Sequence, residues 1–139
     1  MGIDAAATVK LADTFFAAVE AGDLETVTSL YHPDIRIWHS RDEADTDREQ
    51  SMELLSLFFE RVSDRRYEIV RRHTFDGGFV QEHVTHGRMQ DGSVLRLPVC
   101  LICHIDDEGR ITRIAEYFDA TKSPLKGLEQ HHKPLAATA

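Results

Sequence analysis

The sequence has few cysteines, and the two that it has are poorly placed to act together. Cys100 and Cys103 are the only cysteines among 139 residues. Both lie in a strand-like segment, residues 94–105, where side chains three positions apart point to opposite faces of a sheet. A shared redox or zinc site is therefore disfavoured. Each is expected to behave as an ordinary small apolar residue.

Basic residues and long apolar runs are also scarce. The chain has 16 Lys and Arg against 24 Asp and Glu, a net charge of −8. Nucleic-acid binding needs clustered basic side chains that displace counterions, so no nucleic-acid partner is expected. No apolar run approaches the about 20 residues that cross a bilayer, and residues 1–7 do not resemble a signal peptide. We expect a cytoplasmic protein without a membrane partner.

The residues that are present predict one folded domain that begins with helices. With 42% apolar residues, the chain can bury a core. Val9, Ala12, Phe15, Phe16 and Val19 recur at intervals of three and four, which predicts an amphipathic helix with one buried face.

A corner follows the first predicted helix. Gly22 is suited to a helix C-terminus, and Asp23 can cap a second helix over residues 24–31. Pro33 prevents further helix, so residues 35–39 read as a strand. Apolar periodicity predicts a third helix from about residue 47 to residue 62, after a loop over residues 40–46. Alternating segments separated by Gly-containing turns then predict four strands, over residues 67–73, 79–89, 94–105 and 111–118.

This order predicts an α+β fold. The strands form a strongly curved mixed sheet, and the three helices of the N-terminal half close its concave side around a pocket. Pro98 within the third of these strands indicates an edge or a bulge. Residues 1–122 make up the predicted domain, and residues 123–139 are a C-terminal tail without clear periodicity.

Two segments resemble a known superfamily. FFAAVEAGDLETVTSLYHPDIRIWH near the start and DDEGRITRIAEYFD near the end are similar to the nuclear transport factor 2-like superfamily, in particular its SnoaL-like, ketosteroid-isomerase-like and limonene-epoxide-hydrolase-like branches. The likeness covers about residues 5 to 122. It implies a cone-shaped barrel with a single deep apolar pocket, and a homodimer formed through the sheet. The superfamily includes enzymes and non-catalytic binding modules, so the fold alone does not give the chemistry.

The resemblance also implies which functional residues are kept. The general base of the ketosteroid isomerases falls on His39, which can still transfer a proton. Their helix-one tyrosine falls on Phe15 and their neutral acid on Leu101, and neither residue can donate a hydrogen bond to an enolate. Steroid isomerisation by that mechanism is therefore disfavoured.

The same comparison disfavours epoxide hydrolysis. The aspartate, arginine and aspartate of the limonene-epoxide-hydrolase relay fall on Thr85, His83 and Glu116, while the water-holding tyrosine and asparagine fall on Ile37 and His39. Only Glu116 keeps its chemical character. The chain therefore lacks the first carboxylate by which those enzymes activate water.

His39, His83 and Glu116 remain as candidate catalytic residues, because the resemblance implies that all three face the pocket. His39 would be the main base or acid, His83 a second proton carrier, and Glu116 the group that orients a histidine. Gln81 and Thr85 flank His83 on the same strand face and could hold a substrate oxygen. The predicted apolar walls are Phe15, Ile37, Leu97, Val99, Leu101, Ile114 and Phe118.

Two functional hypotheses stay open. The first is an enzyme that performs cofactor-independent acid/base chemistry, as a cyclase, dehydratase or isomerase, on a small apolar substrate with a carbonyl or hydroxyl group. The second is a non-catalytic module for ligand binding or assembly, in which the histidines are merely hydrogen-bonded inside the core. No compact metal motif such as H-E-x-x-H occurs, so no metal is expected. The outward parity of Cys100 and Ile102 favours a homodimer through the sheet.

Overall fold

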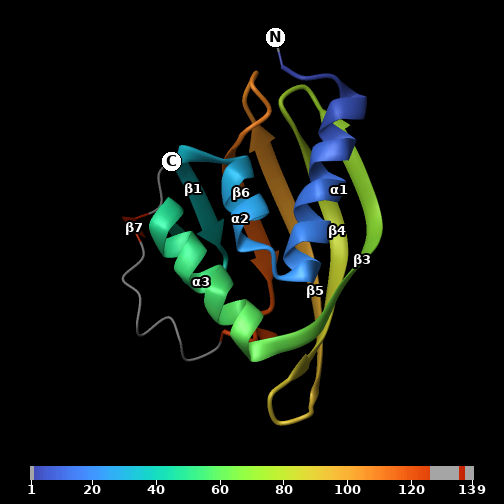
Figure 1. Cartoon of the computed structure of the whole chain (residues 1–139), viewed down its shortest axis with the longest axis vertical. Helices are drawn as coiled ribbons and strands as arrows, with labels where there is room; N and C mark the ends of the chain where they lie inside the picture. Colours follow the sequence, from blue (N-terminus) through green and yellow to red (C-terminus); the bar gives the residue numbers. More distant parts are fainter. Residues whose placement is uncertain (1, 126–134, 137–139) are drawn as a thin grey trace.

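The computed structural model describes residues 2–125 and 135–136, and its three α-helices lie on one face of a mixed sheet (Figure 1). Met1 and residues 126–134 and 137–139, most of the predicted tail, lie outside the described part. The elements are α1 (Ala5–Ala21), α2 (Leu24–Leu30), β1 (Tyr31–His39), β2 (Ala44–Thr46), α3 (Arg48–Arg61), β3 (Val62–Phe75), β4 (Gly78–Met89), β5 (Val94–Ile105), β6 (Ile111–Phe118), η1 (Ala120–Lys122) and β7 (Leu135–Ala136).

The sheet confirms the predicted α+β plan and its curved, cone-like shape. Its strand order is β3-β4-β5-β6-β1-β2-β7. β1 and β6 pair in parallel, and the other neighbours pair antiparallel. Because β3 and β7 occupy opposite ends of this order, the described sheet is open and is not a closed barrel.

Capping residues determine where the helices begin. Asp4, Asp23 and Asp47 each accept a backbone hydrogen bond at the start of α1, α2 and α3. Asp47 and Gln50 form a complete capping box. At the end of α1, Gly22 adopts the left-handed conformation, with φ 71°. The predicted corner between the first two helices is therefore confirmed.

The core lies between α1 and the concave face of the sheet. Leu11, Ala12, Phe15 and Val19 of α1 are all buried. Val9, which the spacing had placed on this face, is 39% exposed. That prediction was wrong, because the buried stripe follows the residues three and four apart from Leu11, and Val9 lies to one side of it.

The strands differ from the prediction at their ends. The expected loop over residues 40–46 contains a short strand, Ala44–Thr46, which pairs with Ile37, Trp38 and His39 of β1. Pro98 lies in an internal strand, but β6 begins to pair with β5 only at Val99. At Pro98 the strand therefore pairs on one side alone, which is compatible with a residue that lacks an N–H donor.

Two further predictions can be compared with the described residues. Cys100 and Cys103 are both free thiols, and Cys103 is buried while Cys100 is half-buried. This agrees with the prediction that they face opposite sides of the sheet. Within residues 2–125 and 135–136, no helix has the length and apolar character needed to cross a membrane.

Candidate functional site

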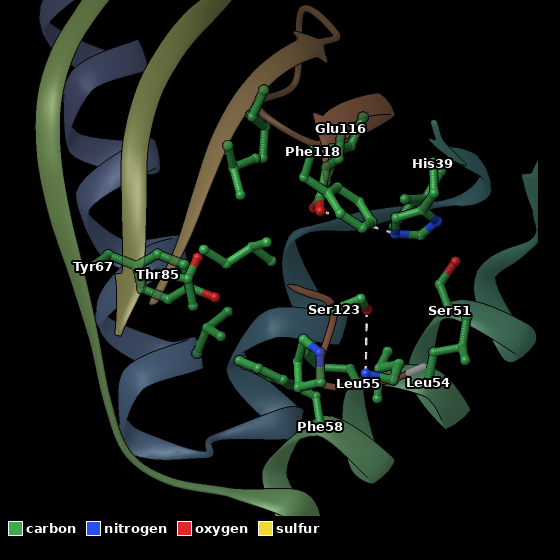
Figure 2. A pocket seen from close by; sticks show the side chains of 18 of the residues that line it. His39, Ser51, Leu54, Leu55, Phe58, Tyr67, Thr85, Glu116, Phe118 and Ser123 are labelled. Carbon is green, nitrogen blue, oxygen red and sulfur yellow. Dashed lines mark hydrogen bonds and ion pairs between the residues drawn. The ribbon is translucent and has the colours of Figure 1, made fainter. Parts of the chain in front are cut away.

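A pocket lies between the helices and the concave face of the sheet (Figure 2). Its volume is about 140 Å³. A cavity of about 150 Å³ is known to hold a benzene molecule, so the pocket as it stands suits a ligand of about one ring. Its lining residues are Phe15, Phe16, Val19, Tyr31, Ile37, His39, Arg41, Ser51, Leu54, Leu55, Phe58, Tyr67, His83, Thr85, Leu97, Val99, Leu101, Ile114, Glu116, Phe118, Ser123, Pro124 and Leu125.

The structure brings the predicted site residues into this pocket, with one exception. His39, His83 and Glu116 all line it, as do eight of the nine predicted substrate contacts. The exception is Gln81, which is 1% exposed and does not line the pocket. Its amide instead bonds to the side chains of His83 and Arg72. Gln81 therefore lies behind the pocket wall and supports it.

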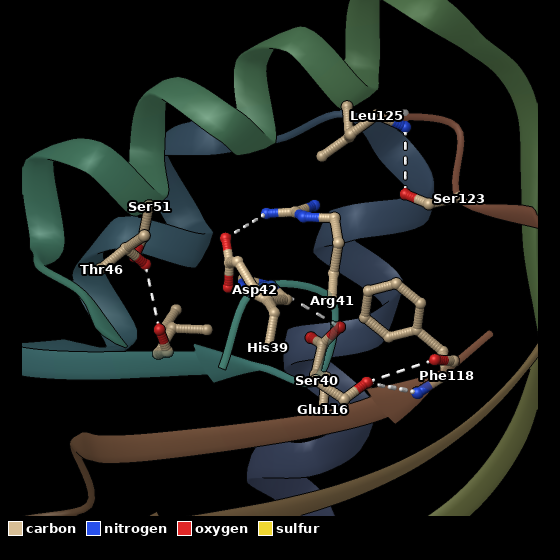
Figure 3. A network of polar contacts seen from close by, with 11 residues as sticks. His39, Ser40, Arg41, Asp42, Thr46, Ser51, Glu116, Phe118, Ser123 and Leu125 are labelled. Carbon is tan, nitrogen blue, oxygen red and sulfur yellow. Dashed lines mark hydrogen bonds and ion pairs between the residues drawn. The ribbon is translucent and has the colours of Figure 1, made fainter. Parts of the chain in front are cut away.

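Strand register places His39 beside Glu116. The two residues are direct partners in the parallel pairing of β1 with β6. The adjacent Ser40 holds the two strand ends together, because its hydroxyl donates to the carbonyl of Phe118 and accepts from the amide of Phe118 (Figure 3). His39 Nε2 lies 3.9 Å from Glu116 Oε2. This distance is too long for a direct hydrogen bond and suits an ion pair or a bridging water.

The surroundings of His39 favour its neutral form. Burial lowers the pKa of His39 below its ordinary value, because the imidazolium ion loses solvation. The Glu116 carboxylate opposes this shift, whereas the Arg41 guanidinium adds to it. His39 Nδ1 is buried and has no hydrogen-bond partner in the described part of the chain. Arg41 is held nearby by Asp42, with Nη2 3.3 Å from Oδ2 (Figure 3).

His83 lies at the end of a chain of polar contacts. On the outside, Arg72 Nη1 lies 2.7 Å from Asp13 Oδ1. Arg72 Nε donates to Gln81 Oε1 at 2.7 Å, and Gln81 Nε2 lies 2.8 Å from His83 Nδ1. We call these four residues, Asp13, Arg72, Gln81 and His83, the relay. It links helix α1 through β3 to the pocket face of β4.

The relay differs from the sequence prediction for His83. Burial, together with the nearby Arg72 guanidinium, lowers the pKa of His83 to about 4. The ring also contacts Phe16 and Tyr67 edge-on, at centroid distances of 5.4 and 5.1 Å. His83 is neutral at physiological pH, and its accepting Nδ1 is already occupied by Gln81 Nε2. The predicted role of second proton carrier is therefore not supported by this geometry.

Two tyrosines line the pocket that sequence reasoning did not select. Tyr31 begins β1, and Tyr67 lies on β3 opposite Thr85. Burial raises the pKa of both phenols, and the Glu116 carboxylate raises it further, so both remain protonated. The sequence prediction placed Tyr31 at the end of the second helix, over residues 24–31, whereas it begins β1 in the structure. Strand parity therefore gave no signal for this residue.

Further lining residues come from α3 and from the chain after η1. Ser51 of α3 bonds to Thr46 at 2.8 Å, which ties the helix to β2 (Figure 3). Ser123 and Leu125, assigned to the tail by the sequence, both line the pocket. The Ser123 hydroxyl accepts a hydrogen bond from the Leu125 amide. The first residues of the predicted tail thus contribute a wall of the site.

The other side of the sheet carries aromatic and histidine side chains that do not line the pocket. Trp38 packs against Tyr117 with ring centroids 5.0 Å apart. His86 bonds to Glu68 at 2.8 Å, and neither His86 nor His104 lines the pocket. Within the described ranges, no group of three or more His, Cys, Asp or Glu side chains is arranged to hold a metal ion.

Comparison with known proteins identifies the family. The family model described as SnoaL-like domain matches residues 12–114. The chain belongs to the SnoaL-like domain family. A search of curated proteins gave no match.

Solved structures share the fold of this SnoaL-like domain at low sequence identity. A proposed SnoaL-like polyketide cyclase from Shewanella denitrificans superposes with a TM-score of 0.72 at 17% identity, over 83% of this chain and 92% of that one. An LEH-like epoxide hydrolase from M. tuberculosis gives 0.71 at 20% identity, over 84% and 81%. A protein of ketosteroid-isomerase-like fold from Catenulispora acidiphila, solved in complex with trimethylamine, gives 0.72 at 14% identity, over 83% and 89%. These likenesses establish the fold and leave the reaction open.

Proposed function

We propose that this SnoaL-like domain is a small-molecule enzyme that transfers protons without a cofactor, as a cyclase, dehydratase or isomerase. The observation that carries the proposal is the pairing of His39 with Glu116 at 3.9 Å on one wall of an apolar pocket. The expected substrate is apolar and bears a carbonyl or hydroxyl group. The proposed polyketide cyclase among the structural neighbours supports this class of chemistry by analogy only.

The arrangement supports distinct roles for the two residues. Neutral His39 has a lone pair available for a proton, since burial lowers its pKa. Once His39 is protonated, the Glu116 carboxylate stabilises the imidazolium ion by charge. His39 is therefore the proposed base, and Glu116 orients it and offsets its charge. The returning proton can come from the same imidazolium ion, so no external acid is needed.

Exchange of α-hydrogens for deuterium tests this proposal without knowledge of the natural substrate. Cyclohexanone fits a one-ring pocket and has weakly acidic C–H bonds beside its carbonyl. We expect the protein to accelerate its deuteration in deuterium oxide, followed by NMR. His39→Ala should slow the catalysed exchange by about a hundredfold while ligand affinity stays nearly unchanged. Glu116→Gln should have a smaller effect, because Glu116 does not carry the proton itself.

His104→Ala is the matched control, since His104 lies on β5 and does not line the pocket. Its exchange rate should equal that of the wild-type protein. If His39→Ala exchanges as fast as this control, His39 is not the base. If cyclohexanone binds in the pocket but its exchange is never accelerated, the binding-module hypothesis replaces the enzyme.

We also propose that the domain forms a homodimer through the face of the sheet opposite the pocket. Apolar side chains continue across three strands of this face, because Ile102 and Trp38 both pair with Ala115, and Cys100 pairs with Tyr117. Tyr117 remains 48% exposed in the single chain. A second copy of the same face would bury this patch.

A further inference from the structure

The hydrogen bonds of the relay determine whether His83 offers a donor or an acceptor to a ligand in the pocket. Arg72 has only N–H donors, so the Gln81 atom that contacts it is the amide oxygen. The NH₂ group of Gln81 must then face His83 and donate to its Nδ1. A neutral imidazole that accepts at Nδ1 carries its proton on Nε2. Contacts outside the pocket therefore lock His83 as a neutral hydrogen-bond donor.

Two phenol groups line the pocket, and one of them lies beside His83. The Tyr67 ring contacts the His83 ring edge-on, 5.1 Å between centroids. Tyr31 lines the pocket at another point, where its ring centroid lies 6.3 Å from that of Phe15. Among the described residues, neither hydroxyl has a protein hydrogen-bond partner, although both tyrosines line the pocket. Hydroxyls on a pocket wall without a protein partner are available for a ligand or for water.

We infer that Tyr67 and His83 form a donor patch that binds a carbonyl or oxyanion oxygen of the ligand. This inference rests on the proposed function, because it assigns the substrate class of the same pocket. Phe15 and Leu101 occupy the positions at which related isomerases place their donors, so the donor patch supplies hydrogen bonds from other elements. Arg72 and Gln81 are positioning residues, since they act on the ligand only through His83.

The donor patch and the base lie on different walls of the pocket. Figure 2 shows Tyr67 and Thr85 on one side of the cavity, with His39 and Glu116 on the other. A ligand that spans the cavity would place an oxygen at the donor patch and a C–H bond at His39. His39 takes the proton, the C–H electron pair moves into a new C=C bond, and the carbonyl π pair moves onto oxygen. The substrate class is therefore an enolisable carbonyl compound whose acidic C–H bond lies on the carbon beside the carbonyl.

Binding of pentafluorophenolate tests the donor patch without any reaction. The compound has one ring, is ionised at mildly alkaline pH, and carries a single oxygen. Pentafluorobenzene has nearly the same shape but lacks that oxygen. Fluorine NMR of both compounds measures the preference for an oxyanion. We expect the wild-type protein to bind pentafluorophenolate at least about tenfold more tightly than pentafluorobenzene, since hydrogen bonds to charged groups contribute about 1.5–3 kcal/mol.

Two conservative variants separate donation from packing. Tyr67→Phe removes one hydroxyl and should weaken pentafluorophenolate binding by about tenfold, with pentafluorobenzene unaffected. Gln81→Glu preserves the shape of the side chain. The new carboxylate should pair with Arg72 through one oxygen and accept a hydrogen bond from His83 through the other. At mildly alkaline pH it should move the His83 proton from Nε2 to Nδ1, which nitrogen NMR detects, and weaken pentafluorophenolate binding similarly. Tyr117→Phe is the matched control, since this hydroxyl lies on the opposite face of the sheet, and its ligand preference should be that of the wild-type protein.

Equal binding of the two compounds by the wild-type protein would overturn the inference. So would an unchanged preference in Tyr67→Phe, or a His83 proton that resides on Nδ1 in the wild-type protein. Failure of the proposed function looks different. In that case pentafluorophenolate is preferred and the variants lose the preference, but cyclohexanone is not deuterated. The donor patch would then belong to a binding module.

Discussion

Replacement of His83 by glutamine should make folding stability less dependent on pH. In the folded protein, burial and the Arg72 charge hold the pKa of His83 at about 4, whereas in the unfolded chain it returns to about 6.5. The unfolded state therefore binds more protons in the interval between these values. Stability rises with pH wherever the unfolded state binds more protons. The His83 contribution is thus lost as pH falls from about 6.5 towards about 4.

The size of this effect follows from the two pKa values. Integration between about pH 7 and about pH 4.5 gives a loss of about 2 kcal/mol from His83 alone. His83→Gln should remove this part of the pH dependence, even though loss of the ring contacts also lowers stability at every pH. Urea unfolding at both pH values measures the change in unfolding free energy for each protein. Only the difference between the two pH values is compared, so the packing loss cancels.

His73→Gln is the control, because His73 is exposed on β3 and loses little solvation on folding. It should keep the wild-type pH dependence. If His83→Gln also keeps it, His83 is not held neutral in the folded state. The reasoning from burial and from the Arg72 charge would then fail.

Three other outcomes are expected from the same structure. Glu116→Gln removes the charge that raises the His39 pKa, so NMR titration should show His39 titrating at lower pH than in the wild-type protein. An unchanged pKa of His39 would show that Glu116 does not interact with it electrostatically. Gly78→Ala should lower the free energy of unfolding by about 1–3 kcal/mol, because an added Cβ collides with the Cys103 carbonyl. Urea unfolding measures this change, and an unchanged stability would show that β4 can shift to make room. Trp38→Arg should give a monomer in sedimentation if the opposite sheet face forms the dimer, whereas an unchanged dimer would place the interface elsewhere.

Much of the fold could be predicted from local sequence rules. The bounds predicted for the last two long strands, residues 94–105 and 111–118, match β5 and β6. Turns that contain Gly92 and Gly109 mark where these two strands begin. Asp23 and Asp47 likewise mark helix starts, because capping depends on a few neighbouring residues. Local hydrogen bonds and periodicity are sufficient for elements of this kind.

Elements that depend on distant partners were not predictable in the same way. The short strand β2 has only three residues, and it forms by pairing with β1 and β7. No pattern of period two can be recognised over such a length. Ser123 and Leu125 enter the pocket through the path of the chain after β6, which strand alternation does not describe. Tertiary packing decides these features.

The two pocket histidines show why residue type and strand parity could not assign the chemistry. Both line the same cavity, and the sequence predicts His39 as the main base or acid and His83 as a second proton carrier. His39 lies beside a carboxylate, so a proton that it accepts is stabilised there. His83 lies in front of an amide that is oriented by a guanidinium, so its accepting nitrogen is already occupied. The difference comes from Arg72 and Gln81, which the sequence places on other strand positions. The two histidines therefore differ because of the side chains that contact each ring. For His83 these side chains are brought together by the register of β3 with β4, which pairs Arg72 with Gln81.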